Sequence, residues 1–177
     1  MAHLGVNAIT VAGRILGELT RIEEALRDCA PDPRFEPPYP TLQVTSIEGG
    51  TAANIVPVGC GIGFEIRAMP GLDIAAIEAR LADFIATECL AGMTAVAPEA
   101  GVEIRRTNHV PPFATGPGSQ AVALALSLAG QNETFAVSYA TEAGLFQDAG
   151  AASVVCGPGR IAEAHTANEW IAAGELE

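Results

Sequence analysis

The sequence contains no lysine. Its nine basic residues are all arginines and are outnumbered by 21 acidic residues, which gives a net charge of −12. Proteins that bind nucleic acid or anionic membrane surfaces need the opposite balance, because both surfaces carry dense negative charge. We therefore expect no nucleic acid and no membrane among the partners, and a small molecule or another protein instead.

Long apolar runs and paired cysteines are also missing. No run approaches the roughly 20 apolar residues of a membrane helix, and Met1 is not followed by the basic and apolar regions of a secretion signal. We expect a cytoplasmic location. The cysteines form no CxxC pair, which argues against a zinc ribbon and a disulfide scaffold, and we expect them to be buried as small apolar residues. They are Cys29, Cys60, Cys89 and Cys156.

Apolar periodicity predicts the first element of the chain. Apolar residues recur every three or four positions from Val11 to Leu26, which predicts one amphipathic helix. Asn7 is placed to cap its start. Five prolines between residues 31 and 40 then predict an extended connector, because proline cannot continue a helix.

Alternating apolar and polar residues predict strands after this connector. One strand is expected around residues 42–44 and a second over 60–67, followed by a helix that Asp73 caps. A third short strand is expected at Val102–Arg105. The order is αββαβ, and one further strand before Asn7 would complete a ferredoxin-like unit. We predict an α+β protein whose first part is a ferredoxin-like α/β sandwich, an antiparallel sheet with two helices.

The composition shifts toward glycine and alanine beyond Pro112. A helix is expected at Ser119–Leu128, with short strands at Thr134–Val137 and Ala152–Val155. This alternation is typical of an α/β layer, but two strands are fewer than the roughly five or six of an ordinary sheet. We therefore predict a boundary between residues 112 and 113, with 113–177 forming a partial α/β domain.

A glycine-rich loop follows the last predicted strand and precedes His165. Glycines let a ligand approach the backbone closely, and loops at strand ends are where α/β proteins place their sites. An imidazole there is a natural metal ligand or proton carrier. Taken alone, a histidine in such a loop is more often a structural or surface residue than a ligand, and this interpretation is the favoured one for His165 on the residues alone.

Several strings resemble one known family. They are GVNAI at residues 5–9, EGGTAANIVP at 48–57, FEIRAMPG at 64–71, TEA at 141–143 and GPGRIAEAHTANEW at 157–170. In this order they resemble the di-zinc, metallopeptidase-like amidohydrolases that include acetylornithine deacetylase, succinyl-diaminopimelate desuccinylase and aminoacylase. The resemblance covers nearly the whole chain, and the spacing of the last string is closest to the acetylornithine deacetylase branch.

The resemblance implies roles for particular residues. It makes His165 a zinc ligand and Asn54 with Arg67 the pair that holds the substrate, and it lines the cleft with Thr141, Gly157 and Gly159. The residue types fit, since arginine offers a planar fork to a carboxylate and asparagine can donate to an oxygen. From the residues alone, Arg67 could instead pair with Glu65, Asn54 could be a turn residue and Thr141 could cap a short helix.

The resemblance also implies an activity. Residues 1–112 would be the dimerisation lid of a homodimer, and 113–177 the C-terminal part of a catalytic domain that holds two zinc or cobalt ions. A metal-bridged hydroxide would attack the amide of an N-acyl amino acid such as N-acetylornithine, a step of arginine biosynthesis. His165 is the only family metal ligand here, so we expect a fragment with no catalytic residue, no tightly bound metal and no activity. The alternative is a self-associating, amino-acid-sensing ferredoxin-like module without catalysis.

Overall fold

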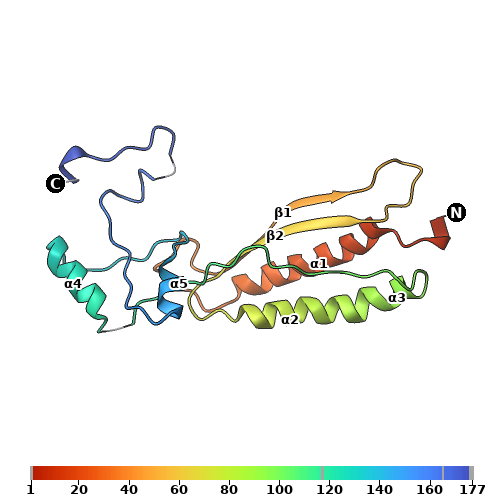
Figure 1. The fold of residues 1–177 in the computed structure, drawn as a ribbon, viewed down its shortest axis with the longest axis horizontal. Coiled ribbons are helices and arrows are strands. Elements are labelled where there is room, and N and C mark those ends of the chain that lie inside the picture. The colour runs from red at the N-terminus through yellow and green to blue at the C-terminus, as the bar shows by residue number, and fades with distance from the viewer. Residues whose placement is uncertain (1, 117, 165, 176–177) are drawn as a thin grey trace. The chain divides into compact units, whose positions relative to one another are not determined.

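The computed structural model describes residues 2–116, 118–164 and 166–175 (Figure 1). The chain divides into two compact units. Unit 1 comprises Met1–Asp32 and Pro37–His109, and unit 2 comprises Pro33–Glu36 and Val110–Glu177. The roles that we predict for residues 1–112 and 113–177 stay a prediction.

Helix α1 (Ala8–Arg27) begins where the sequence predicts. The Asn7 side-chain oxygen accepts hydrogen bonds from the backbone N–H groups of Ile9 (3.0 Å) and Thr10 (3.1 Å), which would otherwise lack a partner in the first helical turn. One face of α1 is buried and carries Ala12, Ile15, Glu18, Leu19, Ile22 and Leu26. The predicted helix, its cap and its apolar stripe are confirmed.

Strands β1 (Thr41–Gly49) and β2 (Cys60–Arg67) form an antiparallel hairpin that lies against α1 (Figure 1). A bulge between Val44 and Ser46 leaves Thr45 unpaired. Side chains alternate between the two faces of a strand, so one extra residue returns Ile47 to the face of Val44. That face is apolar throughout and carries Leu42, Val44, Ile47, Ile62, Phe64 and Ile66.

Helix α2 (Ile74–Phe84) continues without a break through a π-helical segment, η2 (Ile85–Leu90), into α3 (Ala91–Thr94). The Asp73 carboxylate accepts from the backbone N–H of Ala76 at 3.0 Å, as the sequence predicts. Buried residues follow every fourth position, at Leu81, Ile85, Cys89 and Met93. Residues four apart drift by about 40° per step in an α-helix, and the wider π turn reduces that drift. These residues form the core of unit 1 with the buried face of α1 and with Leu42.

The predicted third strand is wrong. Residues 101–110 form no strand, and the sheet of the described chain has only β1 and β2. Val102 packs against the core, and the Arg106 guanidinium binds the Glu78 carboxylate of α2 at 2.6 Å. A strand needs a neighbouring strand for its backbone hydrogen bonds, and the described residues supply none here. The α+β class with an antiparallel sheet is confirmed, whereas the ferredoxin-like set of strands is incomplete in the described part.

Unit 2 contains helices α4 (Gln120–Ala129) and α5 (Ala143–Asp148), and the chain also has two short 3-10 turns, η1 (Ala2–Leu4) and η3 (Ala173–Glu175). The predicted helix after Ser119 is confirmed. The strands predicted at 134–137 and 152–155 are wrong, because neither segment pairs with another strand in the part of unit 2 that the structure describes. The pattern of their residues favours a strand, but the backbone hydrogen bonds of a sheet need two strands side by side.

The cysteines differ in their surroundings. Cys89 is buried, Cys29 and Cys60 are half-buried, and Cys156 is exposed. Burial raises the pKa of the Cys89 thiol. The expectation of burial is therefore confirmed for Cys89 and wrong for Cys156, whose segment pairs with no strand in the part of the chain that the structure describes. Over the described residues, no helix combines the length and the apolar character needed to cross a membrane.

Candidate functional site

Arg67 is the last residue of β2 and is exposed to solvent. Its Nε donates to the Glu65 carboxylate at 2.6 Å. Residues two apart in a strand share a face, so this ion pair follows directly from the local geometry, as the residues alone allow. Both side chains are more than half exposed, so the pair holds Arg67 only weakly. The guanidinium remains accessible to a carboxylate ligand.

Asn54 lies in an exposed turn within the loop that joins β1 to β2. The turn closes with a hydrogen bond from the Ile55 N–H to the Ala52 carbonyl at 3.2 Å. The base of the loop is fixed to α1, because the Ala8 N–H donates to the Pro57 carbonyl at 3.0 Å. The loop thus presents Asn54 to solvent from a fixed base.

The structure does not bring Asn54 and Arg67 together. Asn54 lies in the loop before β2 begins, whereas Arg67 pairs with Thr41 at the opposite end of the hairpin. The eight residues of β2 cover about 23 Å at roughly 3.3 Å per step. That length exceeds an N-acyl amino acid. Within one chain, the two residues cannot hold the same small substrate, and their role as a pair stays a prediction.

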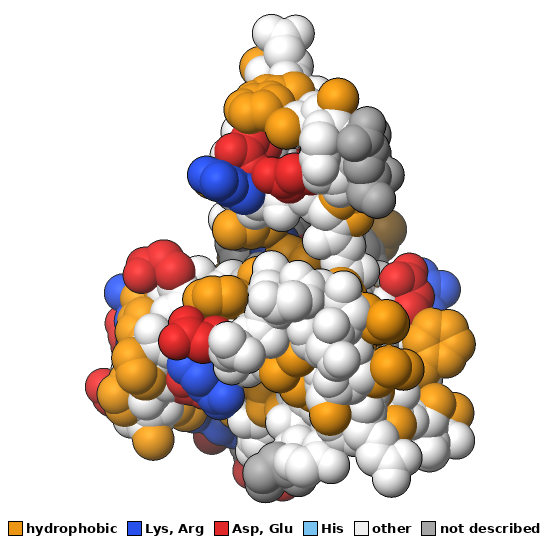
Figure 2. Space-filling model, turned by 90° about the vertical axis from the view of Figure 1, so that its left-hand side faces the viewer, with side chains coloured by type: hydrophobic (Ala, Val, Ile, Leu, Met, Phe, Trp, Pro, Cys, Tyr) orange, Lys and Arg blue, Asp and Glu red, His pale blue; other side chains and the backbone are white. Residues whose placement is uncertain are grey.

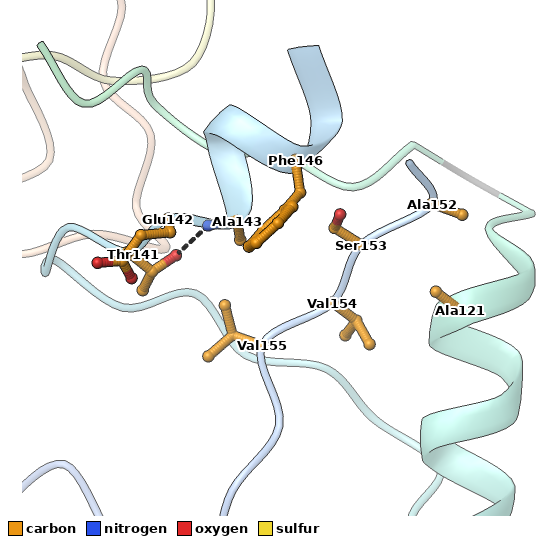
Figure 3. Close-up of a pocket in the computed structure, with 9 residues that line it drawn as sticks. All are labelled: Ala121, Thr141, Glu142, Ala143, Phe146, Ala152, Ser153, Val154 and Val155. Carbon is orange, nitrogen blue, oxygen red and sulfur yellow. Dashed lines mark hydrogen bonds between the residues drawn. The ribbon is translucent and has the colours of Figure 1, made fainter. Parts of the chain in front are cut away.

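Thr141 borders an open hollow in unit 2 of about 390 Å³ (Figure 3). Its hydroxyl oxygen accepts from the Ala143 N–H at 3.1 Å and so serves the start of α5, the structural role that the residues alone suggest. Figure 3 shows α5 and α4 on two sides of the hollow, with residues 152–155 passing between them. The lining is mostly apolar and consists of Ala121, Thr141, Glu142, Ala143, Phe146, Ala152, Ser153, Val154 and Val155.

Gly157 and Gly159 are not among the residues that line this hollow. Gly159 has a φ of 88°, a left-handed conformation that favours glycine, and its N–H donates to the Glu175 carboxylate at 2.7 Å. Gly157 is exposed. The structure therefore gives Gly159 a local backbone role, while the predicted substrate contacts of both glycines stay a prediction.

The predicted metal ligand, His165, lies outside the described residues. Among the residues that are described, no three histidine, cysteine, aspartate or glutamate side chains are close enough to hold a metal ion. A catalytic zinc usually has three protein ligands. The described residues therefore do not fit a two-zinc centre.

Comparison with known proteins decides the family. The family model for the peptidase dimerisation domain matches residues 1–93, more than half of the chain. The chain belongs to the peptidase dimerisation domain family. The match includes all of α1, the hairpin and α2, so Asn54 and Arg67 both lie in the dimerisation domain and Thr141, Gly157 and Gly159 lie beyond it.

Curated relatives are similar to this chain along nearly its whole length. Acetylornithine deacetylase of Myxococcus xanthus is 32% identical over 175 residues, which are 97% of this chain and 44% of that protein. Acetylornithine deacetylase of Aliivibrio salmonicida is 29% identical over 170 residues, 95% of this chain and 43% of that protein. The chain spans less than half the length of these relatives. The family resemblance of the sequence motifs is confirmed.

The dimerisation domain contains one buried acid that we did not single out from the sequence. Glu18 of α1 accepts from Arg21 at 2.9 Å and from Arg80 of α2 at 2.7 Å. Burial works to raise the pKa of Glu18, but the hydrogen bonds and charges of the two arginines outweigh it and the pKa lies below its ordinary value. A charged residue within the apolar stripe of α1 is the signal that could have found it.

Proposed function

We propose that this chain forms the dimerisation lid and part of the catalytic domain of a metal-dependent amidohydrolase. The reaction would remove the acetyl group of N-acetylornithine, in arginine biosynthesis and in the cytoplasm. One observation carries the proposal: the identity to acetylornithine deacetylases extends over 94–97% of the chain and does not stop at the dimerisation domain. Thr141 and the loop that contains Gly157 lie in the part that the family model does not match.

The metal would be held mainly by residues that the described part does not contain. We propose two zinc or cobalt ions in the complete enzyme, with His165 as one ligand. Such ions supply a Lewis acid and an activated water. Because the described residues include no cluster that fits these ions, we expect the chain alone to bind no metal tightly and to hydrolyse no N-acetylornithine.

Self-association would allow Asn54 and Arg67 to bind one substrate although they lie far apart within one chain. The dimerisation domain suggests that two copies of the chain associate. In a homodimer, Asn54 of one copy and Arg67 of the other can face one substrate, although the two residues lie at opposite ends of a hairpin. The arginine fork would bind the substrate carboxylate and the asparagine an amide or carboxylate oxygen, so both residues orient the substrate and neither makes a bond.

Reconstitution tests the proposal. The full chain is co-expressed with the part of the Myxococcus xanthus relative that lies outside the 175 matched residues, and ornithine release from N-acetylornithine is measured with zinc and with cobalt. We expect hydrolysis by the pair. His165→Ala should remove activity and lower the metal content, and full activity with full metal content in that variant would refute the ligand assignment.

Arg67→Ala should raise KM in the reconstituted enzyme with the metal content unchanged, because it removes substrate binding alone. Arg27→Ala is the matched control, since Arg27 is also an exposed, ion-paired arginine of the dimerisation domain. Equal kinetic changes in both variants would refute the role of Arg67. A chain that dimerises and binds amino acids, but gives no hydrolysis with its complement, would favour the amino-acid-sensing alternative.

A further inference from the structure

The hairpin has a polar face opposite its apolar one. At one end of this face, Arg67 of β2 lies opposite Thr41 of β1, and Glu65 lies opposite Gln43. Side chains directly opposite each other in an antiparallel pair are about 5 Å apart at Cβ. Gln43, Glu65 and Arg67 are all exposed. This end of the hairpin therefore presents one cation, one anion and one amide next to one another.

Arg67 keeps most of its donors for a ligand. Its Nε donates to the Glu65 carboxylate at 2.6 Å, and its two terminal nitrogens have no hydrogen-bond partner among the described residues. The terminal nitrogens of a guanidinium form a fork that matches a carboxylate. Arg67 can thus bind the carboxylate of a ligand without releasing Glu65, so that Glu65 stays beside the bound ligand.

Glu65 in turn keeps acceptors for a second group of that ligand. Its side chain is 52% exposed, and a carboxylate can accept more hydrogen bonds than the one from Arg67. The Gln43 amide oxygen is a second acceptor on the same face. An ammonium group has three donors and suits such a pair of acceptors. A place for a cation therefore adjoins the place for a carboxylate.

The charge of the whole protein favours a ligand that fills both places. The chain has a net charge of −12, and Arg67 is the only basic residue of the hairpin. On the face that Figure 2 draws, basic side chains are sparse and lie next to acidic ones. Such a protein repels anions. An N-acyl amino acid with an uncharged side chain is an anion, whereas one whose side chain carries an amine is neutral overall.

We propose that Glu65 determines the specificity of the substrate site, with Gln43 as its helper. Arg67 binds the carboxylate of an N-acyl amino acid, and Glu65 binds an amine on the side chain of the same molecule. Two steps along a strand cover about 6.6 Å, so an amine on a short side chain reaches Glu65. The substrate class is N-acyl amino acids with a side-chain amine. This inference rests on the proposed role of Arg67 but not on hydrolysis.

Binding of two ligands that differ only in the amine tests the inference. The full chain, labelled with nitrogen-15, is titrated with N-acetylornithine and with N-acetylnorvaline, which has the same carbon chain without the amine. The Kd of each is taken from the amide shifts of residues 43, 65 and 67. We expect N-acetylornithine to bind about threefold tighter or more, as one added ion pair gives.

Substitution of Glu65 separates a specificity role from a structural one. Glu65→Gln keeps the volume and removes the charge, so it should abolish the preference by weakening N-acetylornithine alone. If Glu65 only held Arg67 in place, both ligands would weaken equally and the preference would remain. Glu65→Asp keeps the charge and should keep the preference. Glu23→Gln is the matched control, because Glu23 pairs with the exposed Arg27 in α1 and should leave both Kd values unchanged.

Three results would overturn the inference: no binding of either ligand, equal binding of both, or an unchanged preference in Glu65→Gln. A preference that depends on Glu65, without hydrolysis by the reconstituted enzyme, would support the inference and refute the proposed activity. Hydrolysis with the same ratio of kcat/KM for the two substrates in the original enzyme and in Glu65→Gln would refute the inference alone.

Discussion

Removing the Glu18 carboxylate should lower the free energy of unfolding by less than removing its two arginine partners. The Glu18 side chain is 8% exposed, whereas Arg21 and Arg80 are 61% and 44% exposed. Glu18→Gln keeps the volume of the side chain and leaves both arginines in contact with water. It therefore weakens the hydrogen bonds by removing their negative charge, but it leaves no buried charge without a partner. We expect a loss of about 1–2 kcal/mol in the free energy of unfolding. Arg21→Met with Arg80→Met leaves a buried carboxylate alone and should cost about 3–5 kcal/mol.

Urea unfolding at pH 7, followed by far-UV circular dichroism, measures both losses. The reasoning is refuted if Glu18→Gln costs as much as the double arginine variant, because the asymmetry follows directly from which partner is buried.

The lowered pKa of Glu18 also predicts that the stability of the protein depends on pH. The pKa of Glu18 is lowered in the folded protein, so the unfolded chain binds the proton more tightly and stability rises with pH. The contribution of Glu18 is present above its ordinary pKa of 4.5 and is lost as the pH falls through the lowered folded value. The stability difference between the original chain and Glu18→Gln should therefore shrink in acid, and a difference that stays constant from pH 7 to about pH 3 would contradict the network.

Two further predictions concern the dimerisation domain. Asn7→Ala should lower the free energy of unfolding by about 1 kcal/mol, because two backbone N–H groups of α1 lose their acceptor; the exposed Asn132→Ala is the control, and equal urea midpoints would refute the cap. Leu19→Ala should cost about 2–5 kcal/mol, since Leu19 is 1% exposed in the core. In the isolated chain Leu124→Ala should cost far less, and a similar loss of thermal stability in both would contradict the assigned core.

Local chemistry explains which parts of the fold the sequence could predict. The start of α1 follows from Asn7 and the spacing of its apolar residues, and the start of α2 follows from Asp73. The bulge beside Thr45 has no such signal, because it depends on how two distant strands pair. The same limit explains the wrong strand at 102–105. Alternation describes one strand, but only a neighbour makes it part of a sheet.

The candidate site shows a similar limit. The pairing of Arg67 with Glu65 could be foreseen from their spacing along a strand. The separation of Asn54 from Arg67 could not, because thirteen residues of chain can either fold back or extend along a hairpin. The burial of Glu18 is signalled by its place in the apolar stripe of α1, but its pairing with Arg80 could not be foreseen, because 62 positions separate the two residues in the sequence. Contacts over such distances are set by packing of the helices and not by any local pattern.

The most direct test of the proposed function is ornithine release from N-acetylornithine by three samples. They are this chain, the unmatched part of the Myxococcus xanthus relative, and both together with zinc or cobalt. We predict hydrolysis only when both polypeptides are present. Hydrolysis by this chain alone, or none by the pair once binding has been shown, would contradict the proposal that this chain is one part of a metal-dependent amidohydrolase.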